Sequence, residues 1–311
     1  MGGARGGERG AAVIPHLACL FGVVLWASSP TAIKFVLAEM PVWDAPALRF
    51  GLAAIVLWAV AVALGHIGEV RRIGWRPFVA GLVDPGIISI MAYQGFLLTA
   101  ASHGTVIFAL MPLVAALFGR VFLNEPLAAP TIAGATLALA GVVILVSSQD
   151  SAGASSLTGD LLLVGCVILI CGAQIPLRRI AIAHGRPLVT TAIMMSGAAT
   201  TTIFARLVFG DNSAPLAWAA TASTDTWIVF AYTAIVISSS SFVLYNYALR
   251  HLPVARVSLY SVLQTPIGVP LAWAVLGERL SWVEVGAAVL VIAGVAIPVV
   301  VSTRARRAAA V

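Results

Sequence analysis

Two stretches that share one pattern decide the fold of this chain: residues 122–145, FLNEPLAAPTIAGATLALAGVVIL, and residues 275–298, VLGERLSWVEVGAAVLVIAGVAIP. Both stretches place an acidic residue ahead of a long apolar run that contains an Ala-Gly pair. The matches, at a nearly constant offset, are Glu125 with Glu278, Ala140-Gly141 with Ala293-Gly294 and, upstream, Tyr93-Gln94 with Tyr245-Asn246. The chain therefore contains an internal repeat whose copies each end in an apolar helix.

The composition is that of a protein whose surroundings are mostly lipid. Of its 311 residues, 60% are hydrophobic and 10% are charged, and the mean hydropathy is +1.02, whereas a soluble domain carries about 25% charged residues. A helix needs about 20 apolar residues to cross a hydrocarbon layer of about 30 Å. Apolar runs bounded by charges, glycines and prolines predict an all-α membrane protein with ten transmembrane helices, near residues 14–36, 45–64, 77–98, 103–123, 128–148, 160–180, 188–209, 227–249, 254–277 and 283–302.

Basic residues gather on one side when these spans are threaded with the N-terminus inside. Fourteen of the 18 then fall in cytoplasmic segments, and only Lys34, Arg49, Arg206 and Arg279 fall towards the outside. Because basic loops stay in the cytoplasm, we expect a multi-pass protein of a cell membrane, a bacterial inner membrane, with both termini cytoplasmic. The predicted domains are a cytoplasmic tail 1–13, a first five-helix repeat 14–148, an external linker 149–159, a second five-helix repeat 160–302 and a cytoplasmic tail 303–311.

The number of spans in each copy sets the relation between the copies. Each copy holds five predicted spans, so the second copy enters the membrane from the opposite face. Two inverted five-helix repeats are typical of secondary transporters, in which the halves enclose a site near the midplane and expose it to either side in turn. We therefore predict a secondary transporter of small organic molecules that works by alternating access.

Within the second half, the stretch from Tyr245 to Val295 contains YNYALRHLPVARVSLYSVLQTPIGVPLAWAVLGERL. This stretch resembles the second EamA domain of the drug/metabolite transporter (DMT) superfamily. The first half, with LWASSPTAIKFV, ALRFGLAAI and LMPLVAALFGRVFLNEPL, resembles the first EamA domain, although Asn124 stands where the pattern has glycine. The resemblance covers nearly the whole chain. It implies ten helices, cytoplasmic termini and the export of metabolites such as amino acids, their derivatives or organic cations.

Polar and aromatic residues near the middle of the spans are candidates for the substrate site. Trp26 is about 18 Å along the first span, close to the bilayer centre, and the amide of Gln264 is costly at that depth unless it is bonded. Tyrosines offer a flat apolar face and one hydroxyl to an amphiphilic substrate. The alternative for serines and threonines is helix packing, because they let helices approach and bond the preceding turn. The candidate substrate-binding residues are Trp26, Ser89, Tyr93, Met111, Ser241, Tyr245, Tyr260 and Gln264.

Asp84 is the only carboxylate that the predicted spans place clearly below the interface, and Pro85-Gly86 after it predicts a kink. A charged carboxylate is costly at this depth, so we expect protonation of Asp84 to be coupled to transport. The alternative is that Asp84 bonds freed backbone groups or faces cytoplasmic water. Glu125 and Glu278 lie at helix ends beside turns, where we expect caps or hinges.

The basic residues Lys34 and Arg49 fall near the outer surface. Their long side chains can reach water from slightly inside the membrane. We expect them to do so, or to pair with the nearby carboxylates of Glu39 and Asp44.

Other functional classes fit less well. An intramembrane enzyme would need a nucleophile with a base or clustered metal ligands, and neither HExxH nor GxSxG is present. A channel would need a continuous polar stripe, whereas a flippase of lipids or lipid-linked intermediates is compatible with the same architecture. We expect no catalytic residues, no metal and no cofactor. The expected partners are a small-molecule substrate, the lipid bilayer and a proton as coupling ion, with no nucleic acid, in a monomer or a weak homodimer.

Overall fold

The computed structural model describes residues 3–123, 129–148, 155–184, 186–213 and 216–308, with side chains over 13–122, 129–148, 155–183, 186–213, 216–253, 256–297 and at 301. The predicted all-α architecture of ten spans is confirmed within these ranges. Nine of the described spans are long and apolar enough to cross a membrane, and the tenth has an apolar stretch over Trp282–Ile297. Asn124 and Glu125 lie outside the described residues.

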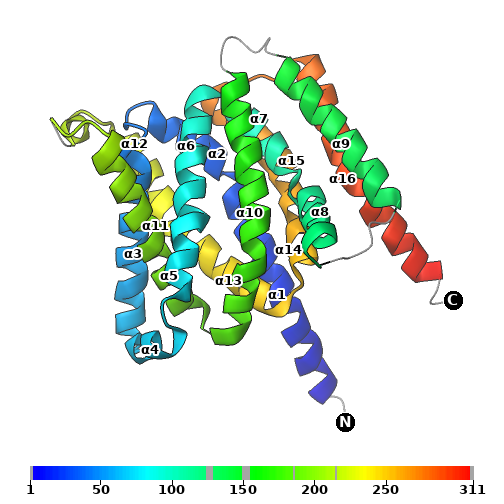
Figure 1. Cartoon of the computed structure of the whole chain (residues 1–311), viewed down its shortest axis with the longest axis horizontal. Coiled ribbons are helices and arrows are strands. Elements are labelled where there is room, and N and C mark those ends of the chain that lie inside the picture. The colour runs from blue at the N-terminus through cyan, green and yellow to red at the C-terminus, as the bar shows by residue number, and fades with distance from the viewer. Residues whose placement is uncertain (1–2, 124–128, 149–154, 185, 214–215, 309–311) are drawn as a thin grey trace.

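The first five spans begin at the N-terminus and end at α9 (Figure 1). Helices α1 (Gly3–Ala27) and α2 (Ser29–Leu37) form the first span, and α3 (Asp44–Ala63) forms the second. Two short helices, η1 (Ile67–Glu69) and α4 (Val70–Ile73), lead to the third span, which comprises α5 (Arg76–Gly81), η2 (Leu82–Ile87) and α6 (Ile88–Leu98). Helices α7 (Ala101–Phe108) and α8 (Met111–Leu123) form the fourth span, and α9 (Ala129–Ser147) forms the fifth.

The second five spans repeat this order. Helix α10 (Leu157–His184) is the sixth span and α11 (Pro187–Phe209) is the seventh, followed by the short η3 (Ala217–Ala220). The eighth span comprises α12 (Thr224–Ala231), η4 (Tyr232–Ser241) and α13 (Phe242–His251). The ninth comprises α14 (Val254–Tyr260), η5 (Ser261–Leu263) and α15 (Gln264–Leu276), and α16 (Trp282–Ala308) is the tenth.

The third and eighth spans, which correspond in the two repeats, are both interrupted by π-helical turns, η2 and η4. In η2, Pro85 has no N–H to donate and Asp84 has an extended backbone (φ −120°, ψ 107°), so the kink follows from the proline. In η4, the hydroxyl of Ser239 donates to the carbonyl of Ala234 at 3.1 Å, a bond that competes with the helical ladder. Irregular backbone at membrane depth is tolerated where protein or a cavity satisfies it.

Helix pairing between the repeats follows an approximate two-fold relation. Helix α9 packs on α16, and α3 packs on α11, so each of these spans meets its own counterpart. Helices α7 and α8 of the fourth span pack on α15 and α14 of the ninth. The contact of α1 with α13 has its counterpart in the contact of α10 with α6. Every span therefore contacts the other repeat.

Helices α9 and α16 cross at two glycines that correspond in the repeats. A Cβ at Gly294 would lie 2.5 Å from the carbonyl oxygen of Gly134, and a Cβ at Gly141 would lie 2.7 Å from that of Ala287. Close backbone approach of this kind drives helix association in membranes, where lipid tails are as apolar as the side chains. The repeated Ala-Gly pair of the sequence is therefore the crossing point of this helix pair.

Both ends of the chain lie at one end of the bundle. In Figure 1 the first turns of α1 and the helix α4, which carries Arg71 and Arg72, lie towards the bottom, and α16 runs downwards to its last turns at the lower right. We name this the terminal end. The opposite end, named the distal end, holds the beginnings of α7, α10 and α16 (Figure 1).

The crossing of α9 and α16 predicts a difference between two glycine substitutions on the same helix. Gly294→Ala should lower the thermal stability, because the new methyl group collides with backbone atoms, and overpacking costs about 1–3 kcal/mol. Gly286 has nothing within 4 Å of its Cβ position, so Gly286→Ala should be neutral or stabilising by up to about 1 kcal/mol. Melting curves of the purified variants in detergent measure the difference, and equal stability would contradict the crossing.

Candidate functional site

A cavity lies between the two repeats. Between its side chains it holds about 840 Å³ of space, with open solvent at its mouth included. Its walls come from α1, α2, α3, η2, α6, α7 and α8 of the first repeat and from α10, α13 and α15 of the second. The lining residues are Trp26, Ser29, Pro30, Ile33, Arg49, Phe50, Asp84, Pro85, Ile88, Ser89, Ala92, Tyr93, Phe96, Phe108, Met111, Ile170, Phe242, Tyr245 and Gln264.

Most of the residues chosen from their depth in the sequence meet at this cavity. Ser241 does not, because it is fully buried inside η4, where its hydroxyl has no hydrogen-bond partner. Tyr260 also lies outside the lining, and its hydroxyl is hydrogen-bonded to Nδ1 of His16 at 2.8 Å. Depth along a helix does not determine the face on which a side chain lies. The chosen residues that line the cavity are Trp26, Asp84, Ser89, Tyr93, Met111, Tyr245 and Gln264.

Arg49 also lines the cavity, whereas its position in the sequence predicted the outer surface. Its side chain is buried; Nε donates to Oγ of Ser238 at 2.7 Å, and Nη1 donates to the hydroxyl of Tyr93 at 3.4 Å. The guanidinium carbon lies 5.4 Å from the ring centroid of Phe50. No carboxylate among the described side chains forms an ion pair with Arg49. Arg49 therefore places a buried cation at the cavity wall. A buried charge of this kind is costly without a charged partner.

Three further polar side chains at the cavity have no partner of their own. Asp84 and Gln264 are buried, and neither side chain forms a hydrogen bond or an ion pair with the described residues. The hydroxyl of Tyr245 is buried and likewise unbonded. The ring of Trp26 stands edge-on to Phe242, with centroids 5.1 Å apart, and lies 4.9 Å from the ring of Tyr245. The cavity thus combines a cation, a carboxyl group and neutral polar groups with an aromatic wall.

Two acidic residues of the first repeat bind the second repeat instead of the basic residues expected for them. Asp44 accepts from Nε of Arg206 at 2.7 Å and from Nε1 of Trp218 at 2.5 Å. The backbone N–H of Ser223 donates to Glu39 at 2.6 Å and lowers the pKa of that carboxyl group. The expected pairing of these carboxylates with Lys34 and Arg49 is therefore wrong. The reason is that segments far along the chain, around Arg206 and Ser223, reach the two carboxylates first.

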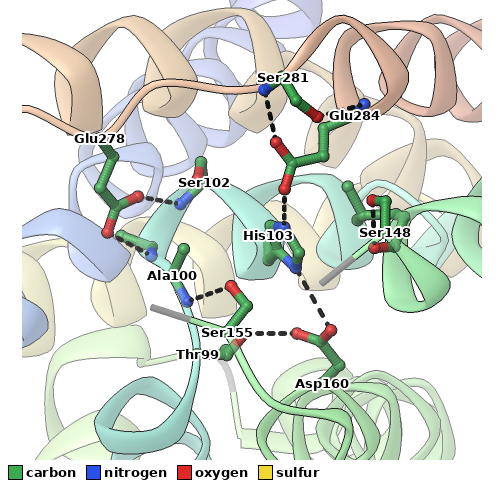
Figure 2. A network of polar contacts seen from close by, with 12 residues as sticks. Thr99, Ala100, Ser102, His103, Ser148, Ser155, Asp160, Glu278, Ser281 and Glu284 are labelled. Atoms are coloured by element: carbon green, nitrogen blue, oxygen red, sulfur yellow. Dashed lines mark hydrogen bonds and ion pairs between the residues drawn. The ribbon is translucent and has the colours of Figure 1, made fainter. Parts of the chain in front are cut away.

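A buried polar network at the distal end holds a histidine between two carboxylates (Figure 2). Nδ1 of His103 lies 3.3 Å from Oδ2 of Asp160, and Nε2 lies 2.8 Å from Oε1 of Glu284. Asp160 also accepts from the hydroxyl of Thr99, and Glu284 accepts from the N–H of Ser281, both at 2.6 Å. The three ionisable side chains are at most 2% exposed. The network joins α7 of the first repeat to α10 and α16 of the second.

Lys34 and Glu278 extend this network. Glu278 accepts from the N–H groups of Ala101 and Ser102, at 2.9 Å each, and so caps the first turn of α7 from the other repeat (Figure 2). Lys34 donates to the backbone carbonyl of Thr99. Among the side chains that the structure describes, no three histidine, cysteine or acidic residues are placed to hold a metal ion.

Asp84 is not the only buried carboxylate among the described side chains. Asp160 and Glu284 are buried as completely as Asp84. Both lie in the first turn of a helix, where a carboxylate commonly serves the helix N-terminus at the surface, so their burial was not predictable from their positions. Glu284 carried one readable signal, because Ser281-x-x-Glu284 is a capping box and both of its hydrogen bonds form.

Comparison with known proteins identifies the family. The Uncharacterized transporter YyaM of Bacillus subtilis is 24% identical over 253 residues, which cover 80% of this chain and 81% of that protein. The Probable terminal-alkyne amino-acid exporter of Streptantibioticus cattleyicolor is 27% identical over 269 residues, which cover 84% and 85%. One solved crystal structure shares the fold, with a TM-score of 0.66 at 19% identity over 95% of this chain and 98% of that one. Because the pattern of the EamA-like transporter family matches residues 13–147 and again residues 157–300, the chain belongs to that family.

Proposed function

We propose that this protein is a secondary transporter that exports small zwitterionic metabolites, amino acids or their derivatives, by alternating access. The observation that carries the proposal is the cavity between the repeats. Among the described side chains, Arg49 at its wall has no carboxylate partner and Asp84 has no basic partner. An amino acid brings one group of each kind, so it would satisfy both residues at once.

The geometry of Arg49 suits a carboxylate ligand. A guanidinium is a planar fork of five N–H donors that binds carboxylates at two points. The bonds to Ser238 and Tyr93 use Nε and Nη1, so the donors of Nη2 are available to a ligand. Asp84 and the amide oxygen of Gln264 are acceptors for an ammonium group. The ring of Trp26 offers an apolar surface for the rest of the molecule.

The same cavity disfavours the organic cations that the sequence leaves open as substrates. A fixed cation such as Arg49 repels a ligand whose only charge is positive, and repulsion of this kind gives specificity. The relative from Streptantibioticus cattleyicolor is named as an amino-acid exporter, which supports the same class of substrate. A lipid substrate has no comparable observation in its favour.

In the proposed cycle the terminal end faces the cytoplasm of a bacterial cell, because basic residues concentrate in the segments at that end. The repeats then tilt about the cavity and expose it to the two sides in turn. No GxxxxGK[ST] motif is present, so an ion gradient supplies the energy. A proton and the ammonium group of the substrate would compete for Asp84, which links export to proton entry.

Replacement of Arg49 tests the carboxylate site. Arg49→Gln should lower the affinity for amino acids roughly 10- to 100-fold, because a hydrogen bond to a charged group contributes about 1.5–3 kcal/mol. Counterflow of labelled amino acids in proteoliposomes, together with thermal shift of the purified protein, measures the loss. The amine that lacks the carboxylate should lose no affinity in the variant and should bind it somewhat better than the wild type, because the repelling cation is gone.

Arg186→Gln is the matched control for the Arg49 variant, because Arg186 is half-exposed, pairs with Glu69 and lies outside the cavity. It should retain wild-type affinity. If Arg49→Gln also retains wild-type affinity for amino acids, or if the wild type prefers organic cations, the zwitterion proposal is wrong.

Replacement of Asp84 tests the competition between proton and substrate. Protonation of Asp84 removes the charge that holds the ammonium group, so the substrate affinity of the wild type should fall as the pH falls. Asp84→Asn should bind more weakly and with no pH dependence in the same range. Thermal-shift titrations at a series of pH values give the affinities, and a variant with the wild-type pH dependence would remove Asp84 from the coupling mechanism.

A further inference from the structure

The geometry of the network at the distal end fixes how many protons it holds. Both ring nitrogens of His103 point at carboxylate oxygens, Nδ1 at Asp160 and Nε2 at Glu284 (Figure 2). A neutral imidazole carries one N–H, so it satisfies one of the two carboxylates and turns a lone pair towards the other. The closed network therefore needs one additional proton, held on the imidazole or on one of the carboxyl groups.

The other charged groups around His103 do not remove this requirement. Helix α10 contributes Asp160 and α16 contributes Glu284, while Lys34 of α2 is bonded to a backbone carbonyl. Glu278, between α15 and α16, is bonded to the N–H groups at the start of α7. Helices α9 and α15 carry no ionisable residue. One imidazole therefore faces two buried carboxylates, one at each ring nitrogen.

The position of the network gives the additional proton a mechanical effect. His103 belongs to the fourth span, Asp160 to the sixth and Glu284 to the tenth, so the hydrogen bonds cross between the repeats. In the proposed cycle the repeats separate at the distal end when the cavity opens to the exterior. Loss of the proton turns a lone pair of the imidazole towards a carboxylate oxygen where water is excluded, which is costly, and so weakens the closed arrangement.

We propose that His103, Asp160 and Glu284 form a proton-binding latch on the external side of the transporter. With its proton bound, the latch holds the repeats together and closes the cavity to the exterior. Release of the proton opens it, so a rise in external pH shifts the protein towards the outward-open state. The direction of opening depends on the proposed function, but the latch is tested without any substrate.

Reactivity of one cysteine in the cavity measures opening at the distal end. Ser29→Cys places a thiol in the lining, and the native cysteines are buried. A membrane-impermeant thiol reagent is added from the distal side at a series of external pH values. The labelling rate is divided by that of Thr221→Cys, an exposed position two residues before Ser223, which bonds Glu39 just beyond α2; this ratio corrects for ionisation of the thiol. The corrected rate should rise with pH at least about fivefold, the lower end of usual coupling between sites.

Glu284→Gln should keep the latch closed without the additional proton. Its amide oxygen can accept from the N–H of Ser281, and its amide nitrogen can donate to Nε2 of His103, which leaves Nδ1–H to donate to Asp160. Labelling of this variant should therefore be slow and nearly independent of pH. Asp225→Asn removes the same charge from an exposed first turn at the same end and should behave like the wild type.

A corrected labelling rate that does not change with pH in the wild type overturns the latch, and so does Glu284→Gln with the wild-type pH response. If Glu284→Gln does not fold, Asp160→Asn repeats the test, because its amide can donate to Nδ1 of His103 and accept from Thr99. The labelling test uses no substrate, so a result that overturns the latch does not bear on the measured affinities for amino acids. Failure of the Arg49 test likewise leaves the labelling result standing.

Discussion

Hydrocarbon offers no hydrogen bonds to a peptide group, and this constraint organises the whole molecule. Helices satisfy it, so every departure from a continuous helix needs local support. The first, third, fourth, eighth and ninth spans are each divided into shorter helices, and each of them contributes to the cavity lining. Of the undivided spans, the second contributes Arg49 and Phe50 and the sixth contributes Ile170, whereas the described residues of the fifth, seventh and tenth contribute none. Every broken span therefore borders the cavity, where irregular backbone at membrane depth is tolerated.

The same solvent changes what holds the two repeats together. Lipid competes well for apolar side chains, so close backbone contacts and polar bonds must supply specificity. Arg49 bonds Ser238, Asp44 bonds Arg206, and His103 bonds Asp160 and Glu284, and every one of these contacts joins the first repeat to the second. Charged groups thus take part in several of the contacts between the repeats.

Composition, the spacing of charges and the repeat were sufficient to predict the fold, because each reflects the bilayer directly. Depth along a span also predicted several lining residues, Trp26 and Gln264 among them. It was insufficient for Ser241, which has the right depth and the wrong face, and for Arg49, which bonds Ser238 on a helix far along the chain. Which face is presented and which partner is met depend on packing between distant segments, and that information is not local.

The crossing of α9 and α16 has a symmetry of its own. Gly141 lies against Ala287, and Gly294 lies against Gly134; exchanging the two repeats converts one contact into the other. A carrier whose halves swap conformations during each turnover can leave this contact as it is, since the swap maps the pair onto itself. In the proposed cycle the helices beside the cavity change their neighbours, whereas α9 and α16 can keep their contact.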